Sequence, residues 1–142
     1  GGAGGFVAGP PELKELLINA ARSFVFATAL ADGLAASALR ALRLMRQQPV
    51  LRQRLADNAT TLRRHLRHQG WTVLGSHHVL PVLTRQHTMQ IADRLLDAGV
   101  FAPAARAPSV PTGQERIRVT VTAAHTDADL DRIAHAFGVP PG

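Results

Sequence analysis

Residues 106–126 read RAPSVPTGQERIRVTVTAAHT, a proline-rich stretch that runs into alternating polar and apolar side chains. The alternation over 116–122 predicts a strand, because successive side chains of a strand point to opposite faces. Arg116 and Arg118 share the polar face of this predicted strand. The prolines fix their own φ angles and favour extended geometry in the residues just before them. We therefore expect a stiff loop that leads directly into a strand carrying two arginines.

On spacing alone, this stretch allows a structural and a functional interpretation. The structural one is a half-buried strand with a solvated polar face, preceded by a plain surface loop. In the functional one, an arginine of the strand reaches a buried anion, since guanidinium binds a carboxylate bidentately and stays charged in any surroundings. Ser109, held between the two prolines, would then offer its hydroxyl to a ligand. Both interpretations remain open at this point.

The rest of the chain predicts long helices followed by strands mixed with shorter helices. Apolar periodicity and end signals predict helices over 11–24, 34–48, 50–70, 88–99 and 126–137. Thr88 is expected to cap the fourth helix, and Thr126 with Asp129 has the spacing of a capping box. Short apolar runs predict strands over 71–75, 78–84 and 100–103, with Pro81 at an edge or an irregularity. This order indicates a small α/β domain preceded by long helices.

The helix predicted over 34–48 is rich in alanine and leucine. Its first half has hardly any polar face, so we expect that half to be buried. Contiguous exposed apolar surface marks interfaces, and the predicted cover is therefore a further domain or a second subunit.

Composition excludes several classes of protein. The chain has 142 residues and no cysteine, which excludes a disulfide framework, a thiolate metal site and a thiol nucleophile, and fits the cytoplasm. No signal-peptide pattern or membrane-spanning apolar run is present. The net charge of +6 comes without aromatic side chains among the arginines, so nucleic-acid binding is not expected. His65 and His68 lack a second ligand cluster nearby, and we expect no metal site.

Three segments together resemble the α-oxoamine synthases, which are pyridoxal-phosphate enzymes of the aspartate-aminotransferase fold. They are GGAGGFVAG at 1–9, ARSFVFATAL at 21–30 and ARAPSVPTGQERIRVTVTAAHT at 105–126. The resemblance implies an α/β chain equivalent to the C-terminal portion of that fold, with long helices before a short antiparallel sheet. It assigns residues 1–48 to the end of the large cofactor-binding domain and residues 49–142 to the small C-terminal domain.

The resemblance also implies roles for particular residues. Thr28 matches the hydroxyl residue that contacts the phosphate of pyridoxal 5'-phosphate from the neighbouring subunit of a homodimer. Ser109 matches a substrate-contacting threonine, and Arg118 matches the arginine that holds the amino-acid carboxylate. Arg106 matches a loop arginine that is structural or faces the acyl chain. The Schiff-base lysine would precede Gly1, so no catalytic residue is expected here, and the chain would be completed by a missing N-terminal half.

The activity implied by the resemblance is a decarboxylating acyl transfer. An amino acid, L-alanine, condenses with a pimeloyl thioester in biotin biosynthesis, and the cofactor acts as electron sink. A glycine-using member of the family is one alternative, and a non-catalytic basic α/β binding module is another. The sequence departs from the family pattern at Ala107 and at Ala31–Asp32, where prolines are usual. The hydroxyl groups of Thr28 and Ser109 are retained despite these departures. The departures leave the preference for one amino-acid substrate less defined.

Overall fold

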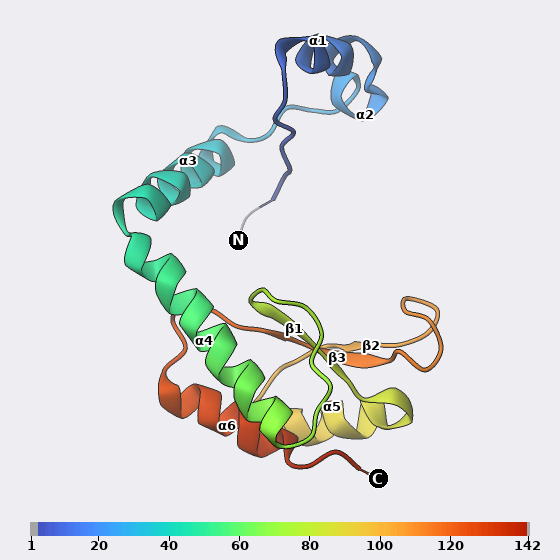
Figure 1. The fold of residues 1–142 in the computed structure, drawn as a ribbon. Coiled ribbons are helices and arrows are strands. Elements are labelled where there is room, and N and C mark those ends of the chain that lie inside the picture. The colour runs from blue at the N-terminus through green and yellow to red at the C-terminus, as the bar shows by residue number, and fades with distance from the viewer. Residues whose placement is uncertain (1–2, 142) are drawn as a thin grey trace. The chain divides into compact units, whose positions relative to one another are not determined.

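The computed structural model describes residues 3–141 (Figure 1). The chain divides into two compact units, Gly1–Gln48 and Pro49–Gly142, which are described separately below. That these units are the end of a large cofactor-binding domain and a small C-terminal domain stays a prediction. None of the helices within the described range is both long enough and apolar enough to cross a bilayer.

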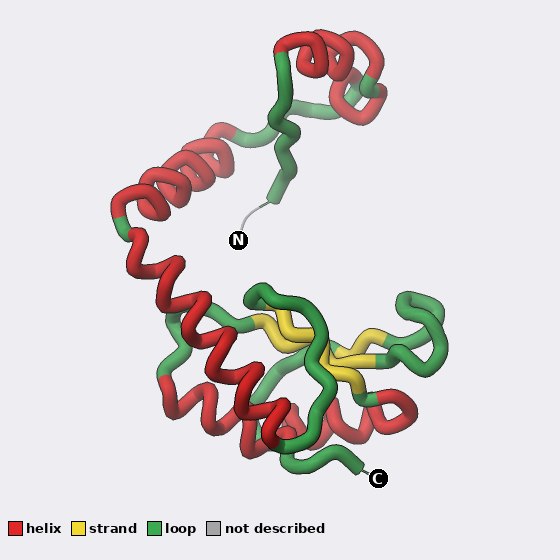
Figure 2. Tube along the Cα trace, viewed as in Figure 1, coloured by secondary structure: helices red, strands yellow, loops and turns green. Residues whose placement is uncertain are grey.

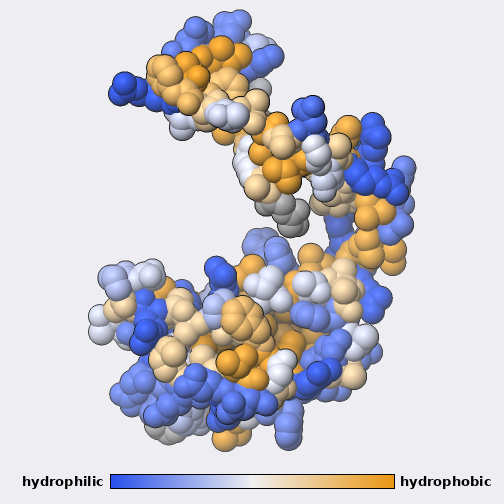
Figure 3. Space-filling model, turned by 180° about the vertical axis from the view of Figure 1, so that it is seen from behind, coloured by the Kyte–Doolittle hydropathy of each residue, from blue (hydrophilic) through white to orange (hydrophobic). Residues whose placement is uncertain are grey.

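The first unit contains the helices α1 (Pro11–Ala20), α2 (Arg22–Val25) and α3 (Asp32–Gln47). One helix was expected over 11–24, but Ala21 is extended, with ψ 96°, and divides it into α1 and α2. No residue of the three helices is buried. Apolar side chains accordingly gather on the surface of this unit in Figure 3.

The alanine- and leucine-rich helix α3 is not buried within the described chain, and its burial against a further domain or a second subunit stays a prediction. Leu39, Leu42 and Met45 of α3 are each about half exposed, at 49%, 56% and 49%. Within the unit α1 and α2 pack against each other, which leaves the apolar stripe of α3 uncovered. A helix with an uncovered stripe of this kind gains little stability from tertiary packing.

The second unit has two layers, a sheet and a helical layer that covers one of its faces (Figures 1 and 2). The antiparallel sheet has the order β1–β3–β2, with β1 at Val79–Leu83, β2 at Ala104–Ala105 and β3 at Arg116–Thr120. The helices are α4 (Pro49–His68), α5 (Thr88–Asp97) and α6 (Asp127–Phe137), with a 3₁₀ turn η1 at Arg85–His87.

The core of the second unit lies between these layers. Ile117 and Val119 of β3 are buried, whereas Arg118 and Thr120 are exposed, as the alternation predicts. Trp71 packs edge-on against Phe137 with ring centroids 5.5 Å apart. The other side chains that are at most 2% exposed in this core are Leu62, Leu66, Leu80, Val82, Ile91, Leu95, Val121 and Leu130.

The strands match the sequence predictions only in part. Pro81 lies in edge strand β1, opposite Arg118, as a residue without an N–H donor should. The segment 71–75 forms only a bridge between Val73 and Val82, with backbone hydrogen bonds from Leu74 to the Pro81 carbonyl and from Leu83 to the Thr72 carbonyl. The strand predicted over 100–103 is wrong: the pairing with β3 begins at Ala104.

Both ends of α6 are satisfied by side chains. At its start the predicted capping box is confirmed: Thr126 accepts from the Asp129 backbone N–H, and Asp129 accepts from that of Thr126. Hydrogen bonds from the Thr126 backbone and side chain hold the pKa of Asp129 below its ordinary value. At its far end Gln69 and Trp71 donate to the carbonyls of Ala134 and Gly138 at 3.0 and 2.7 Å. Free carbonyls at a helix end require such partners.

Candidate functional site

Arg118 lies at the middle of the central strand, on the sheet face that α4, α5 and α6 do not cover. Its backbone N–H donates to the Pro103 carbonyl at 2.9 Å, and Pro81 is its partner on the opposite strand. A strand with neighbours on both sides holds its side chains more rigidly than a loop does. The structure therefore fixes the backbone of Arg118 and presents its guanidinium on an open face.

The two arginines of β3 differ in their partners. The Arg116 guanidinium donates to the backbone carbonyl and to the side-chain oxygen of Gln114, at 2.8 and 3.2 Å. Arg116 therefore fixes the end of the preceding loop. Within residues 3–141 the Arg118 guanidinium has no hydrogen-bond or ion-pair partner. Arg118 is thus the arginine of this strand that remains available to an anion.

The loop before β3 presents Ser109 and Arg106, both exposed. Two backbone hydrogen bonds close turns inside it, from Val110 to the Arg106 carbonyl and from Gln114 to the Pro111 carbonyl. The loop joins the short strand β2 to β3, so Ser109 and Arg118 belong to one hairpin. Ser109 lies in the loop that precedes Arg116, the first residue of β3, and Arg118 lies two positions after Arg116 within that strand.

A buried pair of hydroxyl groups anchors the start of β3, and sequence reasoning missed it. The backbone N–H groups of Thr84 and Arg85 both donate to the Glu115 carbonyl. The Thr84 hydroxyl lies 2.8 Å from that of Thr88, which donates in turn to the Arg85 carbonyl. Thr88 was expected to cap α5, but the N-cap position belongs to His87. The spacing of the two threonines is the only signal of this pair in the sequence.

Asn58 holds the segment that follows β3, and it too was missed. This residue is buried on α4, and its side-chain amide donates to the carbonyls of Thr122 and His125 at 3.1 and 3.0 Å. A buried carbonyl without a donor is costly, so these two bonds fix the chain as it leaves the sheet. A polar residue inside the apolar stripe of an amphipathic helix is the signal that could have found it.

Thr28 belongs to the first unit, in the segment between α2 and α3, and is exposed. Its hydroxyl has no hydrogen-bond partner among the described residues, and a free hydroxyl is a donor that suits a phosphate oxygen. The chemistry of Thr28 therefore fits one contact of a phosphate-bearing cofactor. Ser109 and Arg118 belong to the other unit.

The histidines of α4 belong to no cluster of metal-ligand side chains among the described residues. Within residues 3–141, no group of three or more histidine, aspartate or glutamate side chains could hold a metal ion. The Nδ1 atom of His65 lies 3.6 Å from a carboxylate oxygen of Asp131 on α6. This contact links two helices of the second unit on the side away from Arg118.

Relatives of known name resemble the chain over almost its full length. The 8-amino-7-oxononanoate synthase of Symbiobacterium thermophilum is 42% identical over 137 residues, which are 94% of this chain and 35% of the relative. A Thermus thermophilus protein named 8-amino-7-oxononanoate synthase/2-amino-3-ketobutyrate coenzyme A ligase is 40% identical over 139 residues, 96% of this chain and 35% of the relative. The chain thus spans about a third of the length of the curated relatives it matches.

Solved structures share the fold. The serine palmitoyltransferase of Sphingomonas wittichii is 26% identical with a TM-score of 0.80, over 89% of this chain and 33% of that one. An enzyme of the same name from S. paucimobilis, solved with a bound PLP–myriocin aldimine, has 26% identity and a TM-score of 0.82 over 92% of this chain and 34% of that one. An 8-amino-7-oxononanoate synthase from Francisella tularensis supports the fold alone, at 20% identity and a TM-score of 0.72 over 89% of this chain and 37% of that one.

The relatives and the solved structures agree with the order of helices and strands in this chain. The expected fold, long helices before a small antiparallel sheet, is confirmed by the structural relatives. The profile of the family described as aminotransferase class I and II matches residues 1–137. The resemblance seen in the three sequence segments is confirmed, and the chain belongs to the aminotransferase class I and II family.

Proposed function

We propose that the chain forms the substrate-carboxylate side of a pyridoxal-phosphate-dependent acyltransferase, an 8-amino-7-oxononanoate synthase. One observation carries this proposal: Arg118 extends from the centre of the sheet on its uncovered face, and its guanidinium has no partner within residues 3–141. Membership of the aminotransferase class I and II family supports an enzyme rather than a basic binding module. The names of the relatives at 40% identity and above support the synthase.

Arg118 binds the carboxylate of the amino-acid substrate through two parallel N–H···O bonds. This clamp fixes the rotation of the substrate, and orientation of reacting groups can contribute several kcal/mol to a barrier. Ser109 contacts the same substrate from the loop, and Thr28 donates to the cofactor phosphate. Pyridoxal phosphate, when bound, supplies an electron sink for negative charge at the substrate Cα atom. L-Alanine and a pimeloyl thioester are the proposed substrates.

A relative that uses glycine is the second candidate function. The Thermus thermophilus protein carries both names, so the identity of 40% does not separate the two activities. Glycine and alanine both present a carboxylate to Arg118 and differ only by a methyl group. One methyl group in a pocket typically discriminates by about 1–3 kcal/mol, so the preference depends on what surrounds that methyl group.

A chimera tests the proposal in a protein of the relatives' length. Residues 1–142 replace the matching third of the Symbiobacterium thermophilum synthase, and product formation is measured with L-alanine or glycine and pimeloyl thioester. In the chimera, Arg118→Ala should reduce kcat/KM for L-alanine by roughly 10- to 150-fold, because charge-assisted hydrogen bonds contribute about 1.5–3 kcal/mol. Arg118→Lys should recover only part of this loss, since an ammonium lacks the planar fork.

The matched control is Arg132→Ala, which removes a guanidinium that pairs with Asp129 on α6. This variant should keep kcat/KM within about twofold, and cofactor absorbance should be equal in all three variants. Unchanged kinetics in Arg118→Ala would remove the carboxylate assignment. A chimera that retains cofactor absorbance but forms no product from either amino acid would contradict the synthase itself. A homodimer and a cytoplasmic location stay predictions.

A further inference from the structure

The connection between β1 and α5 holds an arginine in an unfavourable backbone conformation. Arg85 has a φ angle of 49°, and within residues 3–141 every other residue with a positive φ angle is a glycine. A side chain crowds the backbone in this region, so the conformation persists only where the surrounding contacts impose it. Thr84, with φ −125° and ψ −11°, directly precedes Arg85. Arg85 must therefore be held by contacts of its own backbone.

Two successive N–H groups of this connection point at a single acceptor. The backbone N–H groups of Thr84 and Arg85 donate to the Glu115 carbonyl oxygen at 2.9 and 3.2 Å. A turn that directs neighbouring N–H groups to one point forms a concavity of positive potential, which suits an electronegative oxygen atom. Here the concavity is filled by a carbonyl group of the chain itself. The positive φ angle of Arg85 is therefore linked to the position of Glu115.

The hydroxyl groups of Thr84 and Thr88 hold the other side of Arg85. Each hydroxyl has one hydrogen atom, and Thr88 donates its own to the Arg85 carbonyl at 2.5 Å. Thr84 must then be the donor in the 2.8 Å contact between the two hydroxyls, since 3.4 Å to the Glu115 carbonyl is too long for a strong bond. The two threonines are 4% and 2% exposed, so water does not compete for these bonds. The Arg85 backbone is therefore tied at both its N–H and its carbonyl.

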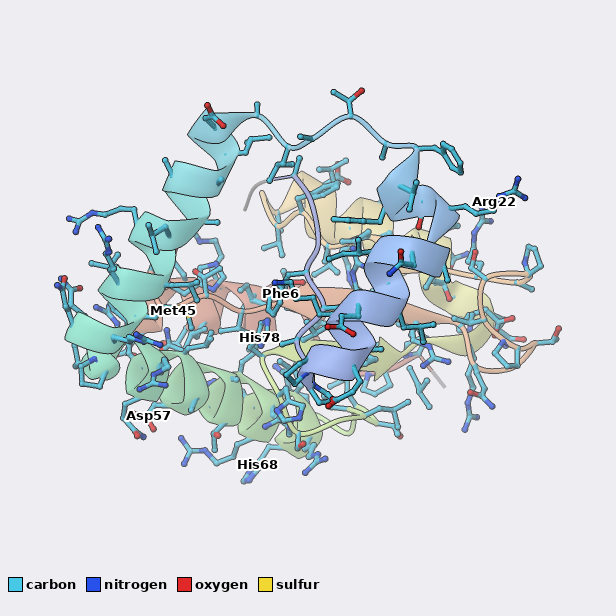
Figure 4. All side chains as sticks on the ribbon, turned by 90° about the horizontal axis from the view of Figure 1, so that it is seen from above. Phe6, Arg22, Met45, Asp57, His68 and His78 are labelled. Carbon is cyan, nitrogen blue, oxygen red and sulfur yellow. The ribbon has the colours of Figure 1, made fainter. Side chains whose placement is uncertain are left out.

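Glu115 lies in the β2–β3 hairpin, residues 104–120, between Ser109 and Arg118. The β1–β3 ladder ends at the residue after Glu115, so the Glu115 carbonyl is the next point at which the hairpin is held. Within residues 3–141, the part of the loop before Glu115 makes hydrogen bonds only inside the hairpin itself. In Figure 4, β1 starts beside the labelled His78 and leads toward the end of the sheet at which this loop lies. The Glu115 carbonyl is therefore the outermost hydrogen-bonded contact between this loop and the rest of the described unit.

We propose that Thr84 and Thr88 are positioning residues for the β2–β3 hairpin. Through the backbone between them, the hydroxyl pair fixes the carbonyl that precedes β3. It thereby sets where the Arg118 guanidinium and the Ser109 hydroxyl meet the amino-acid substrate. This inference rests on the proposed function, in which those two residues contact substrate. Misplacement of a binding group by about 1 Å can cost about 100-fold in rate, so an anchor outside the site affects the kinetics.

A double variant that removes both hydroxyls tests the anchor in the full chain. Thr84→Val with Thr88→Val keeps the shapes of the side chains and leaves neither hydroxyl without its partner, so the unit should still fold. Hydrogen exchange of the Thr84 and Arg85 amides should become about 5- to 30-fold faster, the effect of one or two net hydrogen bonds. Exchange of the Leu66 amide in α4 should be unchanged. Thr84→Ser with Thr88→Ser keeps both hydroxyls and should retain slow exchange.

Kinetics of the chimera measure the effect of the anchor on the substrate. The double valine variant should lower kcat/KM for L-alanine by about 5- to 30-fold, and the double serine variant by less than about threefold. In the Arg118→Ala background the valine pair should cost less than about threefold, because most of its effect passes through the placement of the guanidinium. A pair that only stabilises the fold would give the same loss in both backgrounds.

Two further variants serve as controls. Thr60→Val with Thr72→Val changes two exposed threonines of the same unit and should leave hydrogen exchange and kcat/KM within about twofold. Arg85→Gly keeps the backbone donors and acceptor, and glycine adopts a positive φ angle readily. This variant should therefore retain kcat/KM, and a loss as large as that of the valine pair would assign the effect to the Arg85 guanidinium instead.

Three results would overturn the proposal. Unchanged exchange in the double valine variant would mean that the hydroxyls do not hold the connection. Fast exchange with unchanged kcat/KM would mean that the anchor does not place the substrate contacts, and equal losses in both backgrounds would reduce the pair to general stability. Failure of the proposed function gives a different result, because Arg118→Ala alone would then leave the kinetics unchanged. Hydrogen exchange would still decide in that case whether Thr84 and Thr88 anchor the hairpin.

Discussion

Replacement of Asn58 should destabilise the second unit far more than its single side chain suggests. Asn58→Ala removes the buried amide that donates to two carbonyls, those of Thr122 and His125, in part-buried hydrogen bonds. A net hydrogen bond contributes about 1 kcal/mol, and a buried acceptor left alone costs about 1–3 kcal/mol. We therefore expect the free energy of unfolding to fall by about 2–4 kcal/mol.

The protein contains one tryptophan, which makes the assay specific for the second unit. Trp71 is buried against Phe137, so its fluorescence changes when this unit unfolds in urea. Asn58→Leu should lose about as much as Asn58→Ala, because it fills the space but supplies no donor. Gln53→Ala is the control on the same helix, since it breaks only an exposed bond to Asp57 and should cost less than about 0.5 kcal/mol.

The reasoning fails if both Asn58 variants unfold within about 0.5 kcal/mol of the unmodified chain. Such a result would mean that water replaces the amide at the two carbonyls, and that the segment after β3 is held by other contacts. A loss in Asn58→Ala that Asn58→Leu fully restores would assign the effect to packing rather than to hydrogen bonds. Either result would remove Asn58 from the residues that position the end of the strand.

Two further predictions concern the same unit. Thr126→Ala should lower the free energy of unfolding by about 1 kcal/mol through loss of the helix cap, measured by urea titration. Hydrogen bonds from Thr126 lower the folded-state pKa of Asp129, so its carboxylate stabilises the fold above the unfolded-state pKa. This stabilisation is lost as pH falls through the folded-state pKa. The difference in free energy of unfolding between the unmodified chain and Thr126→Ala should therefore shrink below about pH 4. Leu62→Ala should lower the free energy of unfolding by about 2–5 kcal/mol, because Leu62 is fully buried. Leu96→Ala should lower it by less than about 1 kcal/mol, because Leu96 is 59% exposed. Equal losses in unfolding followed by tryptophan fluorescence would contradict the core described here.

The sequence predicts those elements whose pattern is set by local periodicity. Leu62 and Leu66 are buried and Leu55 is partly buried along the apolar stripe of α4, and alternation places Ile117 and Val119 in the core below Arg118. The capping box of Thr126 and Asp129 joins residues three positions apart and needs no tertiary contact. These features depend on residues close together in the chain, which is why a pattern alone is sufficient to find them.

The missed features depend on partners far apart in the sequence. The strand expected over 100–103 fails because pairing is decided by register with β3, and Phe101 remains 84% exposed outside it. Asn58 contacts carbonyls 64 and 67 positions later, and no local pattern encodes that distance. For the candidate site, the sequence places Arg118 on the polar face of its strand, but only the structure separates it from Arg116, whose guanidinium is tied to Gln114.

The register of the sheet sets the order of events during synthesis on the ribosome. Val79 pairs with Thr120, 41 positions later, so the edge of β1 that joins β3 stays unpaired until β3 has been made, whereas the segment 72–74 already pairs with its other edge. At about 5–20 residues per second, this delay lasts about 2–8 seconds. A strand edge with free backbone groups invites pairing with other nascent chains. Pro81 lacks an N–H group, and its carbonyl accepts from Leu74, so the missing donor lies on the outer edge of β1, where it limits pairing with another chain.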